Sequence, residues 1–225
     1  MSDLEEYFNS IKDEYSEAIK RINPCYIEMI EATLSYFPHN WTPNSILELG
    51  CGTGNLTILL RAKFPKANIL GIDISRDSLE VCKKRLKGNN VELRKMDLQT
   101  VMFDNESFDI VISSLTIHHL TDTKRKALYK KAFKWINKNG WFVVCDRYCD
   151  ENVDISNINR EIWREKAFDK GTKEEEWNKW MLHETEQDHP GNLINQVMGL
   201  KEELNYSTID IVWRKYLWAV IYARK

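Results

Sequence analysis

A glycine-rich segment at residues 50–54 (GCGTG) follows the short apolar run at residues 45–49 (SILEL). Glycine lets the backbone turn sharply and lets a ligand come close. The helix expected next, residues 55–64, would present unpaired N–H groups and the positive end of its dipole to this loop. The pattern indicates a site for a polar or anionic ligand, with a plain structural turn as the alternative.

Asp73 ends the next predicted strand, roughly 20 residues beyond the glycines, where dinucleotide-binding folds place an acid that holds ribose hydroxyls. Two carboxylate oxygens can accept hydrogen bonds from both hydroxyls at once. The alternative role for Asp73 is a helix cap, although Ser75 or Asp77 can also take that role.

Two further polar segments follow predicted strands. Met96-Asp97-Leu98 places an acid between apolar side chains, which suits the exocyclic amine of an adenine. Residues 113–119 (SSLTIHH) come after the next strand. Because open α/β sheets bind ligands at the carboxyl ends of their parallel strands, these segments are expected to meet at one edge.

The elements that must position these residues alternate along the chain. Strands at 45–49, 68–74, 91–96, 108–115 and 141–147 alternate with helices at 55–64, 77–87 and 123–136. This rhythm predicts βαβ units, and therefore a Rossmann-like, doubly wound α/β fold with a mostly parallel sheet.

The flanking segments are different in character. Helices are expected at 3–22, 24–37 and 193–204, the stretch 151–185 is helical and rich in tryptophan, and 208–213 with 216–223 predicts an antiparallel hairpin turning near Arg214-Lys215. We expect one domain, 1–225, with a helical lid (1–40), a cofactor-binding core (45–147), a helical insertion or lid (151–190), and a last helix and hairpin (191–225).

Residues 45–147 resemble the core of the class I S-adenosylmethionine-dependent methyltransferases of small-molecule type. The matching segments are ILELGCGTG, GIDIS, KMDL, FDIVISSLTIHHL and GWFVVCD. The resemblance implies a seven-stranded sheet with an antiparallel last strand. It also implies S-adenosyl-L-methionine as cofactor and in-line methyl transfer to a small acceptor. The dinucleotide fingerprint G-x-G-x-x-G fits less well, because Asn55 stands where its third glycine would be.

The resemblance also assigns roles. The three loop glycines would approach the methionine part, Asp73 the ribose, Ile74 and Asp97 the adenine, and Ser113 the amino group. The segment YSEAIKRINPCY resembles the lid of small-molecule members. The expected cofactor-binding residues are Tyr15, Arg21, Glu48, Gly50, Cys51, Gly52, Gly54, Asp73, Ile74, Ser75, Met96, Asp97, Leu98, Ser113 and Ser114.

His118 and His119 are the candidate catalytic residues, because an imidazole with an ordinary pKa near ~6.5 is partly available as a base at neutral pH. One alternative is that positioning of cofactor and acceptor alone drives the reaction. The other is that His119 turns inward and has a structural role. His118, Arg147, Tyr148 and Trp163 are the expected substrate contacts. The aromatic residues of 151–185 are expected either to shape the acceptor pocket as a lid or to pack as helix core.

The run at residues 183–189 (HETEQDH) contains five potential zinc or iron ligands. Such a polar run is more typical of a solvated loop with caps, so no metal is expected. Five cysteines without a CxxC motif indicate reduced thiols in a cytoplasm.

A formal net charge of −2 argues against general nucleic-acid binding, and neither a signal peptide nor a membrane helix is expected. A monomer or homodimer acting on a small molecule is expected. Two other functions stay open: a tRNA wobble-uridine-modifying transferase that uses a carboxylated cofactor relative, and a non-catalytic cofactor-binding subunit.

Overall fold

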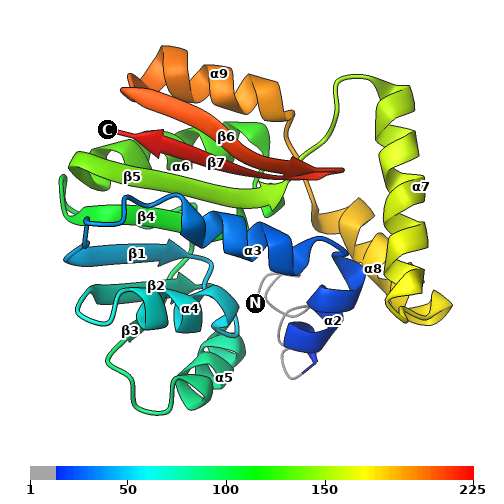
Figure 1. Ribbon diagram of the computed structural model, residues 1–225, viewed down its shortest axis with the longest axis horizontal. Helices are drawn as coiled ribbons and strands as arrows, with labels where there is room; N and C mark the ends of the chain where they lie inside the picture. The colour runs from blue at the N-terminus through cyan, green and yellow to red at the C-terminus, as the bar shows by residue number, and fades with distance from the viewer. Residues whose placement is uncertain (1–13) are drawn as a thin grey trace.

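The computed structural model describes residues 14–225, and the expected helix 3–22 lies partly outside that range. Its centre is a seven-stranded sheet in the order β3-β2-β1-β4-β5-β7-β6 (Figure 1). The strands are β1 Ser45–Leu49, β2 Asn68–Asp73, β3 Glu92–Lys95, β4 Phe108–Ser114, β5 Ile136–Arg147, β6 Thr208–Lys215 and β7 Trp218–Arg224. The first five run parallel, whereas β7 is antiparallel to both of its neighbours. The predicted mixed sheet with its terminal hairpin is confirmed.

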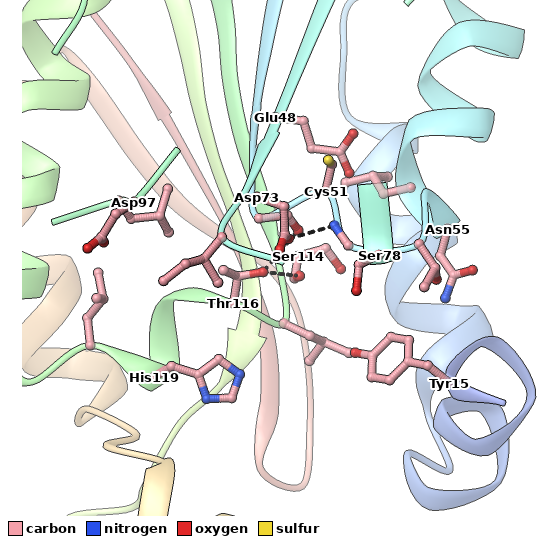
Figure 2. Close-up of a pocket in the computed structure, with 18 of the residues that line it drawn as sticks. Tyr15, Glu48, Cys51, Asn55, Asp73, Ser78, Asp97, Ser114, Thr116 and His119 are labelled. Carbon is pink, nitrogen blue, oxygen red and sulfur yellow. Dashed lines mark hydrogen bonds between the residues drawn. The ribbon is translucent and has the colours of Figure 1, made fainter. Parts of the chain in front are cut away.

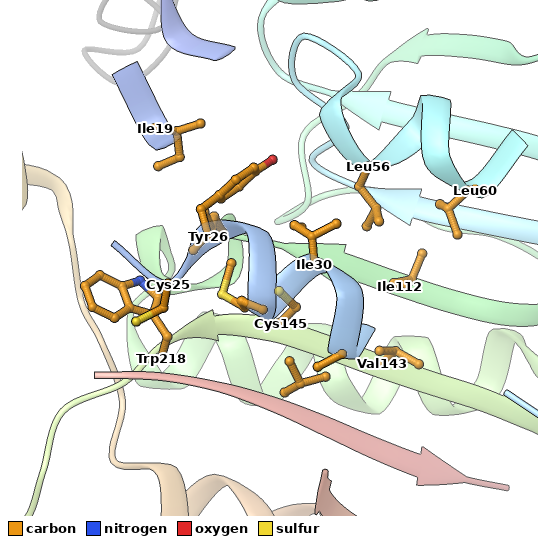
Figure 3. Packing of buried hydrophobic residues seen from close by; sticks show 14 of the residues in the cluster. Ile19, Cys25, Tyr26, Ile30, Leu56, Leu60, Ile112, Val143, Cys145 and Trp218 are labelled. Atoms are coloured by element: carbon orange, nitrogen blue, oxygen red, sulfur yellow. The ribbon is translucent and has the colours of Figure 1, made fainter. Parts of the chain in front are cut away.

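Helices cover both faces of the sheet because successive residues of each buried strand point to opposite sides. Ile46 belongs to a core cluster with α3 (Tyr26–Ser35) and α4 (Asn55–Lys63), part of which Figure 3 shows. Its neighbour Leu47 belongs to the opposite cluster, which includes Leu128 and Leu200. The remaining helices of the sheet layers are α5 Arg76–Leu86, α6 Asp122–Trp135 and α9 Leu193–Leu204.

Three helices gather beyond the carboxyl ends of the parallel strands: α2 (Tyr15–Ile22), α7 (Val153–Asp169) and α8 (Glu174–Gln187) (Figure 1). Trp163 Nε1 donates a 2.6 Å hydrogen bond to the carbonyl of Ile22, which ties α7 to α2. We call α2, α7 and α8 the helical cap.

The two ends of the segment that carries α7 and α8 lie next to each other. Cys149 and Asn192 form a parallel β-bridge, and the Cys149 amide donates to the carbonyl of Gly191 at 3.1 Å. The two ends of residues 150–191 are therefore adjacent in space.

Three sequence expectations are wrong in detail. β5 begins at Ile136 rather than 141, because the chain pairs with β4 there and then bulges before Trp141. The hairpin turns at Tyr216-Leu217, where Tyr216 has a φ of 52°, rather than at 214–215. Residues 183–187 continue α8 instead of forming a solvated loop. Within residues 14–225, no helix has the length and apolar character needed to cross a bilayer.

Candidate functional site

The glycine loop between β1 and α4 has a left-handed backbone that only glycine adopts readily. A Cβ on Gly50 would lie 2.1 Å from Thr116 Cγ2, so that side is packed. A Cβ on Gly52 would meet nothing within 4 Å, so its open side faces a cleft. Gly54 instead packs against Cys82, whose Sγ would lie 2.6 Å from an added Cβ. The loop therefore approaches a ligand at Gly52.

Asp73 lies at the carboxyl end of β2 and holds this loop in place. Its Oδ2 accepts from the Gly52 amide and its Oδ1 from the Ser75 amide, both at 2.8 Å. Ser75 is fully buried and caps α5 by accepting from the Ser78 amide at 3.0 Å. Because Ser75 is the cap, Asp73 does not need to serve as one, and each oxygen of a carboxylate can accept more than one hydrogen bond.

The cleft at this strand edge encloses about 1040 Å³, counting the solvent at its mouth (Figure 2). The expected site residues that line it are Tyr15, Glu48, Gly50, Cys51, Gly52, Asp73, Ile74, Asp97, Leu98, Ser114 and His119. Sequence reasoning missed Tyr26, Thr53, Asn55, Leu56, Ser78, Gln99, Leu115, Thr116 and Leu120, which also line it. Asn55 follows the glycine loop directly, a position that could have been read as part of the site.

Five expected cofactor-binding residues and the catalytic candidate His118 do not line the cleft, and Gly54 and Ser75 are two of the five. Ser113 is buried in β4 and donates from Oγ to the carbonyl of Leu49 at 2.9 Å. Arg21 pairs with Glu176 of α8 at 2.7 Å.

Met96 packs in the core cluster on the opposite face of the sheet. His118 lines the adjoining pocket described below.

Glu48 forms part of the cleft wall although it belongs to a buried strand. It is 1% exposed, and burial raises its pKa to about 8. Among the described residues, its Oε2 has no hydrogen-bond partner. At neutral pH the carboxyl is therefore mostly protonated and can share a hydrogen bond with a bound ligand.

A second pocket of about 450 Å³ adjoins the cleft and shares Tyr15, Leu115 and His119 with it. Its other lining residues are Ile19, Ile22, Asn23, His118, Arg147, Trp163, Trp180, His183, Asp188 and Trp218. Three of the four expected substrate contacts line this pocket. The fourth, Tyr148, is 4% exposed and packs in the core cluster on the opposite face of the sheet.

Side chains bound to carboxylates form the polar wall of the second pocket. His118 Nδ1 lies 2.5 Å from Asp146 Oδ1, and His119 Nδ1 lies 2.7 Å from Asp188 Oδ1. Arg147 contacts Asp188 at 2.8 Å. Asp146 was missed, although an acid at the end of the apolar strand GWFVVCD was a usable signal.

The two histidines differ in their protonation. Burial alone would lower the pKa of His118, but the carboxylates of Asp146 and Asp188 outweigh it and raise that pKa. Burial and the neighbouring His118 ring lower the pKa of His119. His119 is therefore the neutral imidazole of the pair near pH 7.

The profile of the methyltransferase-domain family matches residues 46–140, which carry the glycine loop, Asp73, Asp97 and His119. Residues 46–140 therefore carry a methyltransferase domain of the class I, S-adenosylmethionine-dependent kind. A carboxy-S-adenosyl-L-methionine synthase from Ruthia magnifica is 28% identical over 144 residues, covering 62% of this chain and 60% of that protein. A malonyl-[acyl-carrier protein] O-methyltransferase from Priestia megaterium is 39% identical over 89 residues, covering 39% of this chain and 32% of the relative.

The chain spans less than two thirds of the length of each of these curated relatives. An S-adenosylmethionine-dependent methyltransferase structure from Thermotoga maritima superposes with a TM-score of 0.64 at 17% identity, covering 97% of this chain and 98% of the other. That likeness establishes the fold.

S-adenosyl-L-methionine is the cofactor of this family, and the cleft fits it. Asp73 offers two acceptor oxygens to vicinal hydroxyls, and Gly52 offers a backbone surface without a side chain.

Proposed function

We propose that this protein binds S-adenosylmethionine in the cleft and transfers its methyl group to a small acceptor in the adjoining pocket. The observation that carries the proposal is the continuity of the two spaces, which share Tyr15, Leu115 and His119. In-line displacement needs donor and acceptor on opposite sides of the moving methyl, and two joined pockets supply that arrangement.

The cofactor supplies an electrophilic methyl group when it is bound. On the protein side, Asp73 binds the ribose hydroxyls, Asp97 and Ile74 border the adenine, and the backbone at Gly52 approaches the methionine part. Asp97 Oδ1 accepts from the Gln99 amide at 2.8 Å, which fixes the direction of its carboxylate. Each of these residues lines the cleft.

A small acceptor is favoured by the second pocket. Aromatic side chains from three elements line it: Trp163, Trp180 and Trp218. His119 is the polar group that borders both spaces, and we assign it the contact with the acceptor atom. His118, held by Asp146, positions it.

The direct test measures methyl transfer. Purified protein would be titrated with S-adenosylmethionine, S-adenosylhomocysteine and NAD by calorimetry, then incubated with a library of small amines, thiols, hydroxyl compounds and carboxylic acids. Micromolar binding of the first two and formation of S-adenosylhomocysteine with an acceptor support the proposal. Tight NAD binding without a response to S-adenosylmethionine overturns it.

Formation of a carboxylated cofactor is the second candidate, because the Ruthia relative carries that name and the match covers 62% of this chain. A carboxylate beside the methyl position calls for a cation. Among residues 14–225, those lining the cleft include neither Arg nor Lys. Arg147 lines the second pocket but is already paired with Glu184 and Asp188. Mass spectrometry of the bound cofactor distinguishes the two functions.

A further inference from the structure

A cluster of side chains lies in the wall of the second pocket, where the turn after β4 meets the end of α8. We call it the histidine cluster: His118, His119, His183 and Asp188. Each side chain is at least 90% buried. Donor atoms of His118, His119 and Asp188 all lie within 4.8 Å of one another. This combination of imidazoles and a carboxylate suits zinc and related transition metals.

The spacing of the donor atoms is close to that of a metal site. Ligands about 2.0–2.1 Å from a tetrahedral zinc ion lie roughly 3.3 Å from one another. His118 Nε2 is 3.6 Å from Asp188 Oδ2, and His119 Nδ1 is 2.7 Å from Asp188 Oδ1. Small rotations of these side chains are enough to admit an ion between them.

Outer contacts already orient the ligands. Asp146 Oδ1 binds His118 Nδ1 at 2.5 Å, while its Oδ2 accepts from the His118 amide at 3.1 Å. This leaves His118 Nε2 directed at Asp188. A carboxylate behind a histidine is the usual outer contact of a metal ligand, since it fixes the ring and makes it more basic. Arg147 plays the same orienting part for Asp188, from 2.8 Å.

The buried charges call for a cation. Among residues 14–225, the buried carboxylates of Glu184 and Asp188 pair with two guanidinium groups, those of Arg147 and Arg160, whereas the carboxylate of Asp146 contacts the His118 ring. These three carboxylates outnumber the two guanidinium groups by one, and an unpaired buried charge is strongly unfavourable. A protonated imidazole or a metal ion can neutralise it. The convergence of three imidazole rings on Asp188, with ring nitrogens 2.7–3.6 Å from its oxygens, favours the metal.

We propose that His118, His119 and Asp188 bind one divalent transition-metal ion of the zinc class. His183 Nε2, 3.6 Å from Asp188 Oδ1, is an adjacent group that borders the site. Three protein ligands leave a coordination position open, as in catalytic zinc sites. All three ligands line the second pocket, so the open position faces the space that we assign to the acceptor. Metal binding itself does not depend on methyl transfer, and it is tested without a cofactor or an acceptor.

The test uses the full chain, freed of metal by dialysis against a chelator. Zn²⁺ is titrated by calorimetry, and Co²⁺ by its visible absorption, which is intense only at low coordination number. Mg²⁺ serves as a negative control because it prefers oxygen ligands and water. We expect one Zn²⁺ per chain, a low-coordinate Co²⁺ spectrum and no response to Mg²⁺.

Variants assign the ligands. His119→Gln and Asp188→Asn should weaken Zn²⁺ binding at least a hundredfold, and Asp146→Asn by roughly 10–100-fold as an outer contact. His189→Ala, at an exposed neighbouring histidine, should leave the affinity unchanged. Should a variant fail to fold, the stoichiometry and Co²⁺ spectrum of the wild-type protein decide alone. Wild-type protein without Zn²⁺ binding, or with binding that the folded ligand variants keep, overturns the proposal.

Discussion

Tyr15 of α2 stacks on Trp180 of α8, with ring centroids 6.4 Å apart and ring planes at 22°. Tyr15 lines both the cleft and the second pocket, and Trp180 lines the second. The stack therefore joins two parts of the helical cap directly over the place where cofactor and acceptor would meet. Movement of either helix would open that place to water.

The first prediction concerns this cap. If it closes over bound ligands, S-adenosylhomocysteine should increase hydrogen-exchange protection at residues 14–22 and 160–185 as well as at the glycine loop. A closed cap keeps the reacting centre dry and preorganised. Protection confined to the glycine loop and residues 73–97 would instead mean that these helices are fixed packing elements.

The second prediction concerns Asp73. Asp73→Ala removes charge-assisted hydrogen bonds of about 1.5–3 kcal/mol, so affinity for S-adenosylmethionine should fall roughly ten- to over a hundredfold. Calorimetry gives the affinity, and circular dichroism checks the fold. Glu80→Gln, at an exposed carboxylate of α5, is the matched control and should bind as the wild type does. Unchanged affinity in Asp73→Ala would remove this residue from the ribose site.

The third prediction separates turnover from cofactor binding at the two histidines. His119→Ala should lower kcat by roughly a hundredfold or more while the Kd for S-adenosylmethionine changes little, because we assign His119 the contact with the acceptor atom. His118→Ala should also lower kcat, because His119 would lose the ring that positions it. Single-turnover rates with a confirmed acceptor measure this effect. Full turnover in both variants would show that positioning alone drives the transfer.

The fourth prediction follows from the pKa of about 8 that burial gives Glu48. The unfolded chain releases this proton near its ordinary pKa of 4.5, whereas the folded chain keeps it. Stability is therefore lost as pH rises from about 4.5 to 8. Glu48→Gln, which never ionises, should remove this loss, which amounts to up to about 4 kcal/mol at pH 8.

Urea unfolding of wild type and Glu48→Gln at pH 5 and pH 8 measures the difference. The free energy of unfolding of the variant should exceed that of the wild type at pH 8 and should be close to it at pH 5. An equal difference at both values would mean that Glu48 is ionised throughout, with a partner in the folded state. Glu92→Gln, at an exposed carboxylate of β3, controls for the general effect of removing a negative charge.

The core of the fold was predictable from local pattern, because a glycine loop, apolar strands and helix caps each leave a signature within a few residues. The local pattern therefore predicts that Gly52, Asp73 and Asp97 meet at one edge of the sheet, and all three line the cleft. Contacts between residues that are far apart in the sequence could not be predicted in this way. Nothing near residue 183 shows that Glu184 pairs with Arg147 of β5, or that the His183 ring lies against His119 in the turn after β4. The sequence of that stretch therefore favours a solvated loop.

Arg21 illustrates the same limit. Its position in a lid-like segment predicted a cofactor contact, but Glu176, 155 residues away, lies 2.7 Å from it. The partner is set by how α2 meets α8, and neither helix carries a local signal for that meeting.

The bridge between Cys149 and Asn192 makes residues 150–191 an insertion whose two ends are adjacent in the scaffold. The chain leaves and re-enters the scaffold at one point, so this stretch can lengthen, shorten or be exchanged without changing the span that the sheet must close. Asp73 and the glycine loop lie outside it. Grafting the equivalent stretch from another methyltransferase should therefore change which acceptor is used while leaving the affinity for S-adenosylmethionine intact, and the two traits can diverge independently over evolution.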